Sequence, residues 1–182
     1  MTTLKLVLLA LLTAIQVYLG NVFQFASIGK QFNFGFLPIA VAAAMMGPGS
    51  AAIVAGLGDF IGATMFPAGA YFPGFTFTAV IVGILYALPL YNMPSNKRSV
   101  YWTRAAIAAV LGTLPNLFLN SLWLSILYSS KTYWMWVVSR AASYLIEIPI
   151  QVVVISAVLH ALGKFRFPTF IRLPRKEKVE KV

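Results

Sequence analysis

Long apolar runs, separated by short polar or proline-rich links, are the feature that most limits what this chain can fold into. A helix that crosses the hydrocarbon core of a bilayer needs about 20 predominantly apolar residues. Six apolar segments can be marked out, at residues 4–23, 33–46, 49–66, 75–92, 101–128 and 133–162. The second is the shortest and contains Pro38, so we expect a short or partly re-entrant helix there. The pattern predicts an all-α polytopic membrane protein, a compact bundle of six transmembrane helices.

Composition supports this fold class. The 182 residues are 60% hydrophobic and 10% charged, whereas soluble domains are about 45–50% apolar and about 25% charged. The formal net charge of +10 would suggest a nucleic-acid partner in a soluble protein. Here most basic residues lie between or beyond the apolar runs, which is typical of topology signals. We therefore expect the lipid bilayer, and no nucleic acid, around this chain.

The basic residues also predict an orientation. Six segments place both termini on one side, which carries Lys5, Lys97, Arg98, Arg104 and a strongly basic tail. The other side carries only Lys30 and Lys131, with Arg140 slightly inside the sixth segment. Because cytoplasmic loops carry the excess of Lys and Arg, both termini are predicted to face the cytoplasm (N-in, C-in). Residues 1–163 then form the six-helix transmembrane domain, and residues 164–182 form a basic cytoplasmic tail.

An enzyme is hard to assemble from these residues. The chain has no cysteine and one histidine, His160, which is expected to interact with the end of its helix. Its four acidic residues are Asp59, Glu147, Glu177 and Glu180. It has no GxxxxGK[ST] phosphate loop, and neither a metal cluster nor a Ser-His-Asp arrangement can be built from this set. We expect no enzyme, no metal and no cofactor.

Polar side chains in the sixth segment share one helical face. They are spaced by three or four residues and comprise Trp136, Arg140, Tyr144, Glu147 and Gln151. An Arg or Asp near mid-span costs about 2.5–3.5 kcal/mol on insertion scales, so such groups usually face protein or a cavity. This face is therefore predicted to point into the bundle.

Two other segments add polar groups at similar depth. The fifth presents Asn116, Asn120 and Trp123, and the first presents Gln16 and Asn21. Together they predict an apolar, aromatic cavity, open to the outside, for a small organic ligand with hydrogen-bonding edges and an acid group. The alternative of hydrogen bonds between helices stays open for Gln16, Asp59, Asn116, Glu147 and Gln151.

Two further patterns stand out. Residues 67–79, PAGAYFPGFTFTA, are uncharged, aromatic and stiffened by proline, which favours a pocket lid over 67–75; a hydrophobic turn that caps the bundle is the alternative. Ala10 and Ala14 form a small-xxx-small pair roughly opposite Gln16, which lets another helix approach closely, either within this chain or from a partner.

The order of these features resembles a known family. The stretches FNFGFLPIAVAAAMMGPGSAAIVAGLGDFIGATMFP and GAYFPGFTFTAVIVGILYAL resemble the substrate-binding S components of energy-coupling factor (ECF) vitamin transporters. The pattern FLPIA…MGP…GLGD, at 36–59, is shared widely among S components, whereas GAYFPGFT, at 69–76, is more specific to the folate family. The resemblance implies a subunit of the bacterial plasma membrane that captures its vitamin from outside. It would dock on a transmembrane scaffold driven by two ATPase subunits and topple in the membrane to release its ligand. Ala10 and Ala14 would be the docking residues.

Folate suits the residues. Its flat rings are expected to stack on Tyr71, Phe72, Phe75 and Trp123. Donors and acceptors for the pterin edge are expected from Asn21, Asn120 and Glu147. Its carboxylates are expected on Arg140 and Lys30, with Tyr144 on the same face as Arg140. The alternatives are an S component for another small vitamin or precursor (pantothenate, a thiamine precursor or a queuosine precursor) and a self-standing membrane carrier. A carrier would favour an internal repeat, and none is apparent.

Overall fold

The chain forms a helical bundle with one small hairpin. The computed structural model describes residues 3–22, 24–27, 30–67, 69, 71–91, 98–128 and 131–164. The helices are α1 (Thr3–Val17), α2 (Phe36–Met46), α3 (Pro48–Met65), α4 (Pro73–Leu90), α5 (Arg98–Leu127) and α6 (Tyr133–Lys164). A π-helical turn, η1 (Tyr18–Val22), extends α1, and the antiparallel strands β1 (Gln24–Ser27) and β2 (Lys30–Asn33) follow it. Each of the six predicted segments corresponds to one helix, so the predicted helical bundle is confirmed.

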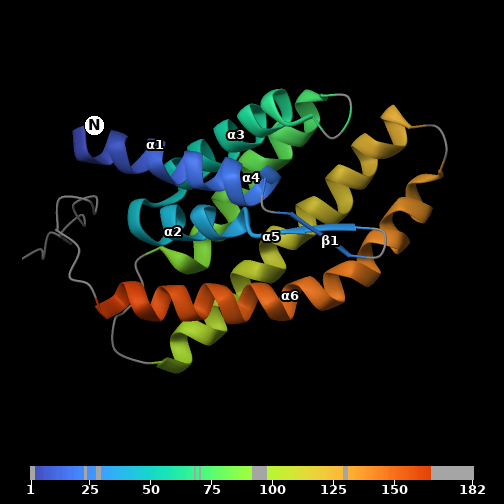
Figure 1. Ribbon diagram of the computed structural model, residues 1–182. Coiled ribbons are helices and arrows are strands. Elements are labelled where there is room, and N and C mark those ends of the chain that lie inside the picture. The colour runs from blue at the N-terminus through green and yellow to red at the C-terminus, as the bar shows by residue number, and fades with distance from the viewer. Residues whose placement is uncertain are drawn as a thin grey trace, which may run out of the picture.

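The helices run alternately up and down the bundle (Figure 1). α3 packs on α4, α4 on α5 and α5 on α6, while α1 lies against α2 and α3. α2 also contacts α4 and α6, which makes it a central element. The N-terminus and the end of α6 lie at one end of the bundle (Figure 1). The opposite end, called the loop end here, holds the hairpin and the starts of α4 and α6 (Figure 1). Which end faces the cytoplasm remains a prediction.

Helix length and composition agree with a membrane protein. The helical stretches Thr3–Asn21, Pro73–Leu90, Ser99–Leu127 and Tyr133–Ala161 are long and apolar enough to cross a bilayer. The second predicted segment forms only the 11-residue α2, as its short apolar run suggested. Large apolar side chains such as Leu88, Leu145 and Ile146 are exposed on the outside of the bundle. In a bilayer these side chains face lipid rather than water.

In the part of the bundle distant from the loop end, small residues let the central helices approach one another closely. Ala42, Ala43 and Ala51 are completely buried. A Cβ on Gly83 of α4 would collide with the backbone of Ala51 in α3, so only glycine permits this approach. Apolar packing thus fills this part of the bundle, and the polar side chains gather nearer the loop end.

Two local details differ from the sequence prediction. α4 begins at Pro73, so Phe75 lies in its first turn and the connection after α3 is shorter than the predicted lid over 67–75. Proline favours the first helical position because its φ is already helical and its missing N–H is not needed there. The hairpin formed by β1 and β2 was not predicted, because the sequence analysis treats the residues between the first two apolar segments only as a link.

Candidate substrate-binding cavity

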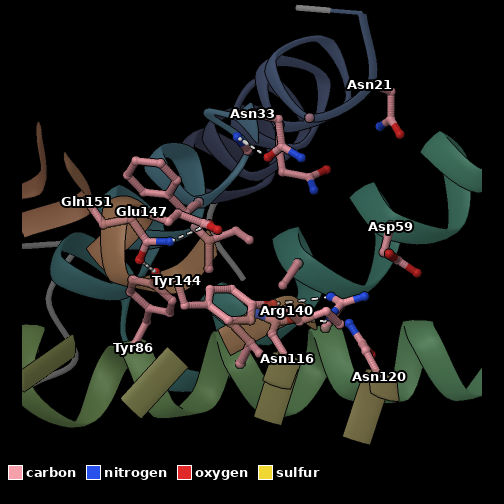
Figure 2. A pocket seen from close by; sticks show the side chains of 18 residues that line it. Asn21, Asn33, Asp59, Tyr86, Asn116, Asn120, Arg140, Tyr144, Glu147 and Gln151 are labelled. Carbon is pink, nitrogen blue, oxygen red and sulfur yellow. Dashed lines mark hydrogen bonds between the residues drawn. The ribbon is translucent and has the colours of Figure 1, made fainter. Parts of the chain in front are cut away.

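A cavity of about 410 Å³ lies between the helices towards the loop end, and we call it the polar chamber (Figure 2). All six helices contribute to its wall, α4 and α6 most of all, together with residues of η1 and of the hairpin end. The lining residues are Gln16, Gly20, Asn21, Asn33, Gly35, Phe36, Ile39, Ala55, Asp59, Ala79, Val82, Tyr86, Asn116, Asn120, Arg140, Tyr144, Glu147 and Gln151.

The deep side of the chamber is organised by a hydrogen-bond chain from α4 to α6 (Figure 2). Tyr86 donates from its hydroxyl to Oε1 of Gln151 at 2.8 Å. Gln151 in turn donates from Nε2 to Oε1 of Glu147 at 2.8 Å. Because Tyr86 and Gln151 are almost fully buried, this chain fixes the orientation of the Gln151 amide. It also holds the Glu147 carboxylate, an acceptor of hydrogen bonds, in the chamber wall.

Arg140 lies on the same face of α6, two turns nearer the loop end than Glu147. Its Nη2 donates to the hydroxyl of Tyr144 at 3.2 Å, one turn deeper (Figure 2). Among the lysines and arginines with described side chains, Arg140 is the one that lines the chamber. It therefore supplies the positive charge of a chamber that also contains Asp59 and Glu147.

The wall formed by α5 carries two linked amides. Asn116 donates from Nδ2 to the carbonyl oxygen of Gly112 at 3.0 Å. Asn120 donates from Nδ2 to Oδ1 of Asn116 at 3.1 Å. This leaves the buried Oδ1 of Asn120 without a hydrogen-bond partner among the described residues. A buried acceptor in that state is costly, and a ligand donor would satisfy it.

A second cavity of about 270 Å³ adjoins the chamber on the loop side, and we call it the aromatic vestibule. It shares Asn21 and Asp59 with the chamber, and its other lining residues are Ala63, Phe66, Gly69, Tyr71, Phe72, Phe75, Leu124 and Tyr128. The rings of Phe72 and Phe75 meet edge to face, with centroids 6.2 Å apart. The two cavities together fall in the size range of small-molecule sites, about 300–1,000 Å³.

Asp59 connects the vestibule to the start of α4. Its Oδ2 accepts a hydrogen bond from Oγ1 of Thr76 at 2.8 Å. Thr76 is also 3.2 Å from the hydroxyl of Tyr71, whose ring packs edge to face on Phe60 of α3. The segment before α4 is thus attached to α3 by polar and aromatic contacts. This is a bridge between helices, as the sequence had suggested for Asp59, but the residue also lines both cavities.

Eight of the ten predicted substrate-binding residues line one of the two cavities, namely Asn21, Tyr71, Phe72, Phe75, Asn120, Arg140, Tyr144 and Glu147. Trp123 does not line either cavity: its Nε1 donates to Oγ1 of Thr78 at 3.0 Å, and its ring packs on that of Phe72, with centroids 5.5 Å apart. Lys30 belongs to β2, and its side chain lies outside the described part of the structure. The predicted docking residues Ala10 and Ala14 are both exposed on α1.

Several lining residues were missed as ligand contacts. Small or apolar ones, such as Gly20, Ala55 and Ala79, carry no pattern that separates them from ordinary packing residues. Three polar ones, Gln16, Asn116 and Gln151, were recognised but left open between ligand contact and helix bridging, whereas Asn33 and Tyr86 were not recognised. Gln151 does bridge to Tyr86, and it lines the chamber as well.

This bundle, with its polar chamber enclosed by apolar helices, defines a membrane protein that binds a small solute with hydrogen-bonding edges. Residues 4–159 match the family described as "ECF transporter, substrate-specific component". The chain therefore belongs to this family, which makes it the substrate-binding membrane component of a bacterial transporter rather than an enzyme.

Individual proteins show which members of the family this chain is similar to. The chain is 38% identical to a protein named "Folate transporter FolT" from Clostridium novyi, over 69% of this chain and 70% of that protein. It is 31% identical to a "Folate transporter FolT" from Leuconostoc mesenteroides, over 82% of this chain and 81% of that protein. A solved structure described as "Crystal structure of FolT bound with folic acid" superposes with a TM-score of 0.76 and 30% identity. The superposition covers 91% of this chain and 96% of that chain.

Proposed function

We propose that this chain binds folate from the extracellular side and delivers it by docking on a transmembrane scaffold that carries two ATPase subunits. The observation that carries the proposal is the match, over nearly the full length of both chains, to a FolT bound with folic acid. The two relatives named as folate transporters support it independently. Other vitamins, such as pantothenate or a thiamine precursor, remain the competing ligands for the test below.

The chemistry of the chamber favours entry of folate with the pterin first. A pterin edge carries N–H donors, which match the Glu147 carboxylate and the free Oδ1 of Asn120. The two carboxylates of the glutamate tail would instead be repelled by Asp59 and Glu147. In this orientation Arg140 donates to an oxygen or ring nitrogen of the pterin, rather than to the tail carboxylates as the sequence had suggested.

The vestibule suits the middle of the ligand. Its rings of Tyr71, Phe72 and Phe75 offer flat apolar contact to the benzoyl group. The glutamate tail then lies at the mouth of the vestibule, in contact with water. Contacts made there are screened by water and add little affinity.

Fragments of folate are expected to separate the two orientations. Pteroic acid, which lacks the glutamate, is expected to bind within about fivefold of folate, because it loses only screened contacts at the mouth. The complementary fragment p-aminobenzoylglutamate is expected to bind at least about 30-fold more weakly, because the chamber then loses the hydrogen bonds of the pterin. Calorimetric titration of the purified chain measures all three.

The outcomes have distinct meanings. A large loss for pteroic acid, with strong binding of p-aminobenzoylglutamate, would show that the carboxylates bind at Arg140 and would reverse the orientation. Absence of folate binding, with a different vitamin identified by mass spectrometry of the extracted ligand, would refute folate as the substrate.

A further inference from the structure

Two glycines of α3 face side chains of the first helix. Gly58 and Gly62 are four residues apart, a spacing that in membrane helices usually lets two backbones approach. Here a Cβ on Gly58 would fall on the amide of Gln16, and a Cβ on Gly62 would fall on the amide of Asn21. The glycine positions are therefore occupied by two amide side chains, and both of these amides line the polar chamber.

Gln16 has an unsatisfied polar atom. The residue is only 8% exposed, and its Oε1 has no hydrogen-bond partner among the described residues. Its amide lies between Gly58 and Gly20, neither of which offers a side chain to it. Rotation about the last side-chain bond exchanges its oxygen and nitrogen within the same space. A partner for this amide is therefore expected from the chamber itself.

The backbone beside Gln16 is irregular. α1 ends at Val17 and continues as the π-helical η1, which contains Gly20 and Asn21. Nδ2 of Asn21 donates to the carbonyl oxygen of Val17 at 3.1 Å. Short π-helical turns in longer helices occur frequently at functional sites. Here the turn holds the Asn21 amide at the boundary of the two cavities.

We propose that Gln16 is a substrate-binding residue whose amide hydrogen-bonds the edge of the flat ring in the polar chamber, and that Gly58 is its positioning residue. Because residue 58 has no side chain, the Gln16 amide lies against α3. It therefore stays out of the space that the flat ring of the ligand would occupy. The identity of the ring rests on the proposed function. The role of Gln16 rests on its burial, its unsatisfied oxygen and its place in the chamber wall.

A double-mutant cycle with folate tests this pair. Gln16→Ala is expected to weaken binding by about five- to tenfold, the value of one hydrogen bond. Gly58→Ala is expected to weaken it by about tenfold or more, because the new Cβ pushes the Gln16 amide into the ligand space. The double variant is expected to match Gln16→Ala alone within about twofold, because the three atoms nearest to the new Cβ all belong to Gln16.

Melting curves separate a ligand contact from a purely structural role. Gln16→Ala is expected to leave the melting temperature without ligand unchanged and to reduce its rise with folate. Gly49→Ala is the matched control on the same helix, since a Cβ there meets nothing within 4 Å; its affinity is expected to equal that of the wild type. If Gly58→Ala does not fold, Gly62→Ala with Asn21→Ala provides the second cycle.

Additive effects of Gln16→Ala and Gly58→Ala, or unchanged affinity in Gln16→Ala, would overturn the inference. A wild-type chain that does not bind folate would instead refute the proposed function. In that case the same cycle, measured with the vitamin extracted from the purified chain, decides the role of Gln16.

Discussion

Replacing Arg140 with alanine is expected to weaken folate binding by about 100-fold, the upper range for a hydrogen bond from a charged group. Two effects add. The ligand loses a cationic donor within an enclosed chamber, where such bonds are stronger than in water. The chamber also retains Asp59 and Glu147 without their cation, and this negative charge disfavours the oxygen and nitrogen acceptors of the pterin that Arg140 would otherwise bind. Calorimetric titration of the purified variant measures the loss.

The chain offers matched controls for this variant. Arg140→Lys keeps the charge but loses the planar fork, so an intermediate affinity is expected. Arg104 lies at the opposite end of the bundle and donates to the carbonyl oxygen of Pro89 at 3.1 Å. Arg104→Ala is therefore expected to bind folate like the wild type. An Arg140→Ala chain that binds folate within about threefold of the wild type would remove Arg140 from the proposed site.

The helices could be predicted because each apolar run has only one stable backbone conformation in a bilayer. Their bounds were less predictable where local chemistry decides. Pro73 starts α4 before the apolar run becomes continuous, which brings Phe75 into the helix. The hairpin of β1 and β2 depends on pairing between two four-residue strands, and segments this short carry no periodic pattern that would reveal it.

The polar face of α6 could also be predicted, because Arg140, Tyr144 and Glu147 recur at helical spacing. The contacts that each of these side chains makes across the bundle could not be predicted. Trp123 shares a face of α5 with Asn120, yet it turns to Thr78 and supports the vestibule instead of lining it. Gly58 received no role of its own in the sequence analysis, and only the position of Gln16 shows what occupies the space beside it.

Bulky substitutions on the exposed face of α1 are expected to abolish uptake without affecting binding. Ala10 and Ala14 are exposed one turn apart, on a face roughly opposite Gln16. Small residues at this spacing let a second helix approach closely, and large side chains prevent that approach. The Ala10→Trp/Ala14→Trp double variant is expected to bind folate within about twofold of the wild type, since neither residue lines the polar chamber or the aromatic vestibule. ATP-driven folate uptake by cells or proteoliposomes containing the scaffold and both ATPases is expected to fall to background.

A control on another helix separates a docking defect from a general disturbance of the lipid-facing surface of the protein. Leu145 of α6 is 76% exposed, and Leu145→Trp adds a similar ring to a different face of the bundle. This variant is expected to transport folate normally. Co-purification with the scaffold is expected to fail only for the α1 variant, which would assign the transport loss to assembly. If the α1 variant instead assembled and transported like the wild type, docking through this face would be refuted, while the binding function of the chamber would be unaffected.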